Sequence, residues 1–354
     1  MSVLVIGGGP IGLAAAIEAR LAGFSVTVVE PRYLEPGGID KACGEGLMPG
    51  ALPLLERLGV HPEGMPLRGV SYRSASRHVD HLFENGDGLG VRRTTLQTAL
   101  AERAAELGVV TMPGRAHRIE QDDSGVSVTL AAPSGITPDV LRADWVLGCD
   151  GLHSVVRREI GLNTAINRTS RARRRFGFRQ HFAVAPWSEL IEVHWTPSVE
   201  AYVTPVSPTV TGIALLGPPG TDFLAEIAKV PELAIRLLGA APASALRGAG
   251  PFHTRARKPS EGRVLLVGDA SGYVDAITGE GLRLGFEQAR VAVANVTAGT
   301  PRGYDSDWRR VTRDFRALTN GLVSVANGPL RSAIVPLAQR LPRVYGSVVE
   351  RLAR

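Results

Sequence analysis

Three glycines near the N-terminus have the type and spacing of residues that bind a dinucleotide. Gly7, Gly9 and Gly12 form a G-x-G-x-x-G pattern between an apolar strand over 3–6 and an Ala-rich helix expected over 10–21. Glycine permits the tight turn, lets the backbone approach a pyrophosphate, and lets helix and strand pack closely. The free N–H groups and the positive end of the helix dipole would then face the phosphates.

An acidic residue completes this unit at the end of the next strand. Residues 25–29 form a second apolar strand, and Glu30 follows it directly. Its carboxylate can accept hydrogen bonds from the 2′- and 3′-hydroxyls of a ribose, and its charge would repel a 2′-phosphate. The sequence therefore predicts a dinucleotide-binding βαβ unit, although this pattern alone does not distinguish NAD from FAD.

The expected elements divide the chain into an α/β part, a β-rich part and a helical tail. Apolar strands alternate with amphipathic helices in the α/β part, which predicts a Rossmann-like domain. Period-two alternation in the β-rich part predicts an inserted antiparallel sheet, followed by one helix near 223–239. The tail helix is expected to break at Pro336 and Pro342. We assign residues 1–70, 88–163 and 255–300 to the α/β domain, residues 71–87 and 164–254 to the sheet domain, and residues 301–354 to the tail.

Composition and charge narrow the kinds of protein further. The 354 residues are 44% hydrophobic, which is enough for two domains with cores of their own. Cys43 and Cys149 suit a reducing cytoplasm, and we find neither an apolar run of membrane-spanning length nor the basic start of a signal peptide. The net charge of +6 comes almost entirely from arginine, and the arginine-rich run 168–175 lacks the aromatic platform of a nucleic-acid site. We expect a cytoplasmic protein that does not bind nucleic acid.

Three further motifs follow the glycine turn and carry a resemblance to a known superfamily. The motifs are Arg93-x-x-Leu96, Asp150-Gly151-x-x-Ser154-x-x-Arg157, and Gly268-Asp269-Ala270 with Gly279-Glu280-Gly281. In this order they resemble those of the FAD-dependent aromatic hydroxylases (group A flavoprotein monooxygenases) and of their relatives, the geranylgeranyl reductases and flavin halogenases. The resemblance implies FAD as cofactor and a glutathione-reductase-type fold similar to para-hydroxybenzoate hydroxylase. It also implies transient binding of NAD(P)H, because the sequence has no second dinucleotide fingerprint.

The resemblance also implies a role for each motif residue. Asp269 would bind the ribityl hydroxyls of FAD, and Gly279 and Gly281 would let the backbone approach the flavin ring. The helix that begins near Gly281 would direct its N-terminus at the pyrimidine edge, where reduced flavin is negative. Arg93 would lie beside phosphate or ribityl groups, or else be a surface charge of its helix. Asp150 would support the flavin site, or else only stabilise the turn that it begins.

Within this superfamily the motifs point in different directions. Residues 43–47, CGEGL, and residues 275–281, DAITGEG, are similar to those of the geranylgeranyl reductases. The aromatic P-x-x-Y-x-W-x-F-P pattern of those reductases is eroded, because its prolines remain but its aromatic positions hold Glu200, Tyr202 and Thr204. The paired tryptophans of the halogenases are absent as well. A substrate with polar groups therefore fits better than a bare polyprenyl chain.

The candidate catalytic residues lie in the predicted sheet and in the CGEGL loop. His194 lies on one strand, and Tyr202 and Thr204 share one face of the next. If the face with these residues meets the flavin, His194 and Tyr202 supply a phenol-binding or proton-accepting group; otherwise they are solvent-side residues. Cys43 is expected near the flavin as a pocket thiol, or else as a small buried filler. His181 is a weaker candidate, expected at the surface or in a structural role.

These observations lead to one expected function and two alternatives. We expect NAD(P)H to reduce FAD and O2 to add at flavin C4a, so that the hydroperoxide hydroxylates an electron-rich carbon of an aromatic or polyketide-like small molecule. The first alternative is a geranylgeranyl-type reductase that passes hydride to a C=C bond of a prenylated substrate without oxygen. The second is a flavin-bound scaffold whose C-terminal segment contacts a membrane as an amphipathic helix, unless that helix packs on the FAD domain. No metal site is expected, because no His or Cys spacing resembles one.

Overall fold

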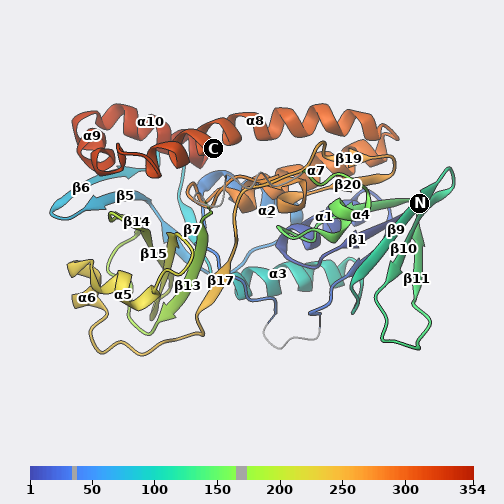
Figure 1. Cartoon of the computed structure of the whole chain (residues 1–354), viewed down its shortest axis with the longest axis horizontal. Coiled ribbons are helices and arrows are strands. Elements are labelled where there is room, and N and C mark those ends of the chain that lie inside the picture. Colours follow the sequence, from blue (N-terminus) through green and yellow to red (C-terminus); the bar gives the residue numbers. More distant parts are fainter. Residues whose placement is uncertain (34–37, 165–173) are drawn as a thin grey trace.

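A parallel sheet forms the centre of one half of the computed structural model, which describes residues 1–33, 38–164 and 174–354 (Figure 1). Its strand order is β19-β20-β12-β1-β2-β8, and every neighbouring pair except β19 and β20 is parallel. The strands are β1 (Ser2–Ile6), β2 (Ser25–Val29), β8 (Val110–Met112), β12 (Trp145–Gly148), β19 (Ser260–Glu261) and β20 (Val264–Leu266). The carboxyl ends of the parallel strands therefore meet at one edge, where ligands of such sheets bind.

Helices cover one face of this sheet, and a small antiparallel sheet covers the other. The helices are α1 (Pro10–Leu21), α2 (Leu52–Leu58), α3 (Arg93–Glu106) and α7 (Gly281–Thr297), and the covering strands are β9 (Ala116–Asp122), β10 (Gly125–Leu130) and β11 (Val140–Ala143). Side chains alternate along β1: Val3 and Val5 belong to the helical core, whereas Leu4 and Ile6 pack against the β9–β11 side. Burial on both faces explains why β1 is apolar throughout.

A seven-stranded sheet forms most of the other half. Its order is β17-β13-β16-β15-β14-β5-β6, and neighbours are antiparallel except for β5 and β14. The strands are β5 (Gly69–Ser74), β6 (Arg77–Leu82), β13 (Phe176–Phe182), β14 (Leu190–Trp195), β15 (Glu200–Ser207), β16 (Val210–Gly217) and β17 (Arg247–Ala249). The prediction of one helix over 223–239 was wrong. Pro231 divides it into α5 (Phe223–Ala228) and α6 (Pro231–Arg236), because proline cannot continue a helical hydrogen-bond pattern.

Further short elements lie outside these sheets, and the chain passes between the two halves several times (Figure 1). They are β3 (Gly46–Leu47), β4 (Met65–Leu67), β7 (Gly88–Gly90), α4 (Val155–Glu159), β18 (Thr254–Arg255) and β21 (Gly272–Tyr273). The division into the three parts given above stays a proposal. The seven-stranded sheet already includes Gly69, so its first segment begins slightly before the proposed boundary at residue 71.

The tail consists of α8 (Pro301–Ala326), α9 (Ile334–Arg340) and α10 (Pro342–Ala353), which lie along one side of the molecule (Figure 1). The predicted break at Pro342 is present, since that residue begins α10. The predicted break at Pro336 was wrong. Pro336 lies in the first turn of α9, where a missing N–H removes no helical hydrogen bond, and the chain turns before Ile334 instead. Among the described residues, no helix is both long and apolar enough to cross a membrane.

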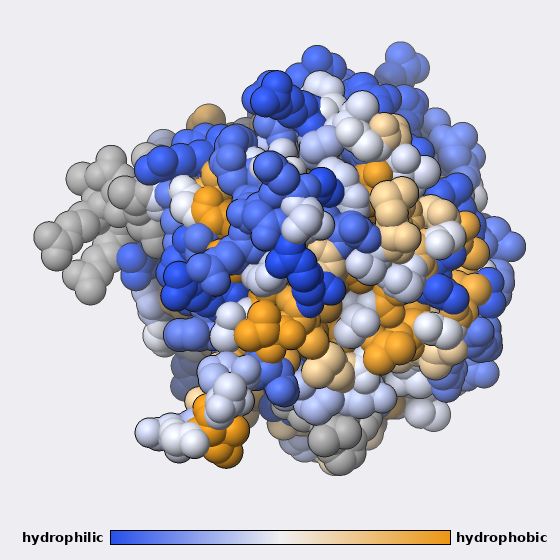
Figure 2. Space-filling model, turned by 90° about the vertical axis from the view of Figure 1, so that its right-hand side faces the viewer, coloured by the Kyte–Doolittle hydropathy of each residue, from blue (hydrophilic) through white to orange (hydrophobic). Residues whose placement is uncertain are grey.

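The end of the molecule that carries β9–β11 is mainly hydrophilic (Figure 2). Its apolar areas are separated by polar and charged ones, and exposed apolar side chains of this half include Val110 and Val140. Most of the arginine-rich run 168–175 lies outside the described residues.

Candidate active site

A cavity of ≈ 430 Å³ extends from one half of the molecule into the other. The parallel sheet contributes the glycine turn after β1 and Glu30 after β2, whereas the seven-stranded sheet contributes Ile191, Val193 and Tyr202. The loops after β12 and β20, which carry Asp150 and Asp269, line the same cavity. Residues from all the sequence motifs therefore meet around one space.

The glycine turn has the geometry that a bound pyrophosphate requires. Gly7 has a φ of 105°, a conformation that favours glycine, and a Cβ added to Gly12 would lie 1.8 Å from the Gly7 carbonyl oxygen. Gly9 is the N-cap of α1 and provides no capping side chain, so the first N–H groups of the helix stay available to a ligand. The Glu30 carboxylate lies beside this turn and accepts a hydrogen bond from the Gly8 N–H at 2.8 Å.

Arg93 and Asp150 each bring an unpartnered polar atom to the cavity lining. Within the described part of the chain, Arg93 Nε and Asp150 Oδ1 are buried without a hydrogen-bond partner. The other Asp150 oxygen accepts hydrogen bonds from the N–H groups of Val155 and Val156 at 2.6 and 3.1 Å. Burial raises the pKa of Asp150. Asp150 thus stabilises the turn that it begins, and its second carboxylate oxygen has no partner among the described residues. Its predicted support of a flavin stays a prediction.

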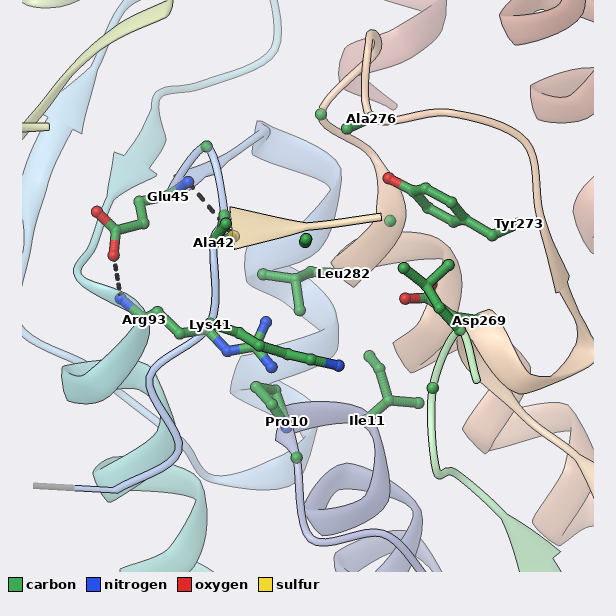
Figure 3. Close-up of a pocket in the computed structure, with 18 of the residues that line it drawn as sticks. Pro10, Ile11, Lys41, Ala42, Glu45, Arg93, Asp269, Tyr273, Ala276 and Leu282 are labelled. Carbon is green, nitrogen blue, oxygen red and sulfur yellow. Dashed lines mark hydrogen bonds between the residues drawn. The ribbon is translucent and has the colours of Figure 1, made fainter. Parts of the chain in front are cut away.

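Lys41 extends across the cavity toward Asp269 (Figure 3). Burial raises the pKa of Asp269, and the Lys41 charge opposes that shift; burial in turn lowers the pKa of Lys41. Gly279 and Gly281 line the same region at the start of α7. The N-cap residue Glu280 makes no capping hydrogen bond, so the N-terminus of α7 can interact with a ligand. An anionic edge of a bound group would be stabilised there.

Arg157 holds the two acidic loops together. Its Nη1 donates to the Ala270 carbonyl oxygen at 2.8 Å, and its Nη2 donates to the Leu152 carbonyl oxygen at 2.9 Å. Ala270 follows Asp269 and Leu152 lies two residues after Asp150, so one guanidinium fixes the relative positions of both loops. This contact explains the arginine that ends the D-G-x-x-S-x-x-R motif.

Glu45, which the sequence did not mark as a site residue, fixes the CGEGL loop. Its Oε1 accepts a hydrogen bond from the Arg93 N–H at 2.8 Å, and its Oε2 lies 2.5 Å from Nε2 of His181 (Figure 3 shows the first contact). Both Glu45 and His181 are almost fully buried. Arg179 also forms an ion pair with Glu45, with Nε 3.7 Å from Oε1, and another with Asp40, which lies three residues before the loop. His181 has a structural role, as expected for it, but one that belongs to this site.

Two features of the sequence could have drawn attention to Glu45. It stands between two glycines, Gly44 and Gly46, and its φ of 60° is unusual for a residue with a side chain. Its partner His181 is 136 residues further along the chain. The acid in a glycine-rich loop was therefore visible, but its contacts were not.

Two of the three positions that replace aromatic residues line the cavity. Tyr202 donates to the Ile277 carbonyl oxygen at 3.0 Å, and Thr204 donates to the Gly44 carbonyl oxygen at 2.8 Å. Burial raises the pKa of Tyr202, so its phenol stays neutral. Cys43 lines the cavity as well. Glu200, at the third position, is instead buried in ion pairs.

The face expected for His194 was wrong. The register of β14 and β15 pairs Val193 with Tyr202, so these two residues share the face that lines the cavity. His194 lies on the opposite face, where its Nε2 is 3.2 Å from Oε2 of Glu192. Sequence parity on two separate strands could not reveal this, because the register decides which positions face the same way.

Glu280 is expected to make stability depend on pH. Burial raises its pKa from 4.5 to about 7, although Arg283 opposes the shift. The folded state therefore holds this proton more tightly: its stabilising contribution is complete below pH 4.5 and is lost as pH rises through about 7. In the wild type, this titration should lower the free energy of unfolding by at most about 3 kcal/mol as the pH rises. Glu280→Gln cannot titrate and should not show this fall. Urea denaturation at about pH 5 and about pH 8 gives the free energy of unfolding of the wild type and of the variant. If this free energy falls equally in both proteins, other groups cause the pH dependence.

Three curated relatives resemble this chain over most of its length. The 12-dehydrotetracycline 5-monooxygenase/anhydrotetracycline 6-monooxygenase of Streptomyces rimosus is 29% identical, over 81% of this chain and 60% of its own length. Para-nitrophenol 4-monooxygenase of a Pseudomonas species is 27% identical, over 90% of this chain and 85% of its own length. Menaquinone reductase of Mycolicibacterium smegmatis is 27% identical, over 99% of this chain and 88% of its own length. The chain thus spans 60% of the length of the tetracycline enzyme.

The fold and the family agree with these likenesses. The crystal structure of a flavoprotein/dehydrogenase from Cytophaga hutchinsonii matches all of this chain and 92% of its own, with a TM-score of 0.84 and 20% identity. Among the described residues, no group of three or more His, Cys, Asp or Glu side chains could hold a metal ion. The family profile described as "FAD binding domain" matches residues 1–209, which include the glycine turn, Arg93 and Asp150. The chain belongs to this family of FAD-binding proteins.

Proposed function

We propose that this protein is an FAD-dependent monooxygenase that uses NAD(P)H and O2 to hydroxylate an aromatic or polyketide-like small molecule. The observation that carries the proposal is the shared cavity, which joins the dinucleotide-binding turn to a largely apolar compartment containing neutral phenols. The relatives named for tetracycline and para-nitrophenol oxygenation support the reaction type. A cytoplasmic location stays part of this proposal.

The residues around the cavity fit FAD. Gly9 and Arg93 would hold the pyrophosphate, since the turn leaves N–H groups uncapped and the Arg93 Nε is buried without a partner among the described residues. Glu30 would bind the adenosine ribose, and Asp269 would bind the ribityl chain from the carboxyl edge of the sheet. The N-terminus of α7, at Gly281, would stabilise negative charge on the pyrimidine edge.

The chain itself would contribute positioning and exclusion of water rather than acid–base chemistry. A bound flavin would supply the redox chemistry that the resemblance implies: it would pass the electrons of NAD(P)H to O2, so that one oxygen atom goes to an electron-rich carbon of the substrate and the other leaves as water. Tyr202 would orient a phenolic substrate, because its hydroxyl is neutral and can still accept a hydrogen bond. Cys43 and Thr204 would shape the same region. His194, on the far face of the sheet, has no part in this proposal.

The first alternative remains a C=C reductase that uses the same flavin without oxygen. The CGEGL and DAITGEG segments and the likeness to menaquinone reductase support it. The second alternative, a membrane-associated scaffold, is weakened by the tail: Tyr345, Val349 and Leu352 on the apolar face of α10 are buried in the protein. Only outward residues such as Leu337 and Leu341 are left to contact lipid. Steady consumption of NAD(P)H would dismiss a scaffold without catalysis.

Isotopic oxygen separates the monooxygenase from the reductase. We expect the purified FAD-loaded protein, supplied with NADH or NADPH and a panel of phenols, to consume O2 and to place one atom of ¹⁸O₂ in the product. Mass spectrometry of the product and oxygen uptake measure this directly. Oxygen-independent oxidation of NAD(P)H with reduction of a prenylated quinone such as menaquinone would contradict the proposal and favour the reductase.

A further inference from the structure

We infer that helix α10 forms a wall of the substrate compartment, and that Val349 and Leu352 limit the apolar substituent that a phenolic substrate can carry. The substrate compartment is the part of the cavity lined by Val70, Tyr72, Val193, Tyr202, Val349 and Leu352. This inference rests on the proposed function, from which it takes the assumption that the substrate carries a phenol. It adds the ligand class, a phenol with an apolar substituent, and the residues that select it.

Two residues of the tail reach the cavity. Val349 and Leu352 are 4% and 7% exposed, and both line the cavity together with Met48 and Val70. Val349 also belongs to the same apolar cluster as Ile191 of the seven-stranded sheet. Val349 and Leu352 lie more than 330 residues after the glycine turn, and no sequence motif marks them. The tail therefore completes the compartment with apolar side chains.

Helix α10 is anchored at several points along its length. Tyr345 donates to the Val70 carbonyl oxygen at 3.0 Å, near the start of the helix. Glu350 lies 2.9 Å from Nε2 of His81 and accepts a hydrogen bond from the Glu84 N–H at 3.0 Å. The end of the chain packs on Gly50, where an added Cβ would lie 2.1 Å from the backbone carbon of Arg354. These contacts hold the helix as a fixed wall.

The compartment offers hydroxyl groups on one side and only apolar contacts on α10. Tyr72 and Tyr202 bring phenols from β5 and β15, and burial raises the pKa of Tyr72 to about 12, so that it stays neutral. Val349 and Leu352 offer no hydrogen bond. A ligand that satisfies both sides has a hydroxyl group at one end and an apolar substituent at the other.

Binding of a homologous series of phenols tests the wall without requiring turnover. The oxidised holoenzyme is titrated with phenol, 4-propylphenol and 4-hexylphenol, and binding is followed by the change in flavin absorbance. Val349→Ala and Leu352→Ala enlarge the compartment. Each should therefore raise the ratio of the affinity for 4-hexylphenol to the affinity for phenol by about tenfold relative to wild type. Val349→Phe should disfavour 4-hexylphenol by a similar factor. Val344→Ala is the matched control, because Val344 lies on the same helix but is 57% exposed and outside the cavity.

The outcomes distinguish this inference from the proposed function. FAD content and thermal melting establish that each variant is folded, and the alanine variants keep the test usable if Val349→Phe fails to fold. If the ratio of the affinities for 4-hexylphenol and phenol is the same in every variant and in Val344→Ala, the inferred role of α10 is wrong, even if phenols are hydroxylated. Phenols that bind with the expected ratios but are not hydroxylated would leave the wall intact and contradict the monooxygenase. Failure of every phenol to bind wild type would overturn the inference as well.

Discussion

Replacing Gly9 by alanine is expected to give a folded protein that does not retain FAD, whereas replacing Gly12 by alanine is expected to prevent stable folding. A Cβ on Gly12 would lie 1.8 Å from the Gly7 carbonyl oxygen, and neither backbone can move because both belong to the β1–α1 unit. We expect a loss of about 4 kcal/mol or more for Gly12→Ala. On Gly9 the nearest atom would be the Arg93 Nη2 at 3.7 Å, an ordinary contact, and the φ of −69° suits alanine.

The two glycines therefore separate folding from cofactor binding. The added methyl group of Gly9→Ala would occupy the space where a pyrophosphate approaches α1, and we expect FAD affinity to fall by about a hundredfold or more. Flavin absorbance after purification and calorimetric titration of the apoprotein measure this loss, and circular dichroism reports folding. Gly321→Ala is the control, because Gly321 is exposed in α8 with no atom near its Cβ position. Unchanged FAD affinity in Gly9→Ala would contradict the placement of the pyrophosphate.

A second large effect is expected at Glu45, which has a matched counterpart in Glu192. Both carboxylates are buried, both lie within hydrogen-bond distance of a histidine Nε2, and both face an arginine. Removing one member of a buried charged group leaves the others unpaired, so Glu45→Ala and Glu192→Ala should each lose about 3–5 kcal/mol of stability. Only Glu45 holds the cavity loop and the Arg93 N–H. Glu45→Ala alone should therefore weaken FAD binding.

Comparing the two variants isolates positioning from stability. Urea denaturation of the apoproteins gives the stability change, and quenching of FAD fluorescence gives the affinity. We expect about a tenfold or larger loss of FAD affinity in Glu45→Ala, little loss in Glu192→Ala, and partial recovery in Glu45→Gln, whose amide oxygen can still accept from Arg93. Equal FAD affinity in the two alanine variants would remove Glu45 from the site and leave it a purely structural residue.

The dinucleotide end of the site could be predicted because its signals are local. The spacing of Gly7, Gly9 and Gly12, the strand before them and Glu30 after the next strand all lie within one βαβ unit. The acidic motifs were also visible, since each follows an apolar strand at the carboxyl edge of the same sheet. In such a unit, the chain connectivity itself brings the residues together.

The substrate end could not be predicted, because distant contacts build it. Whether His194 or Val193 faces the cavity depends on a register between β14 and β15 that sequence parity does not specify. Glu45 depends on His181 from β13, and the compartment wall depends on Val349 from the last helix. Polar residues at the eroded aromatic positions predicted a substrate with polar groups, and Tyr202 and Thr204 do line the cavity. The sequence did not reveal that Glu200 is buried in ion pairs or that α10 adds apolar side chains to the lining.

The reaction of the reduced holoenzyme with oxygen tests the proposed monooxygenase most directly. The protein is reduced without oxygen, then mixed with oxygenated buffer in a stopped-flow spectrometer, with and without a bound phenol. We expect a transient absorbance that differs from both reduced and oxidised flavin and that lasts longer when the phenol is bound. A direct return to the spectrum of oxidised flavin under both conditions would contradict the proposed monooxygenase and would favour the C=C reductase.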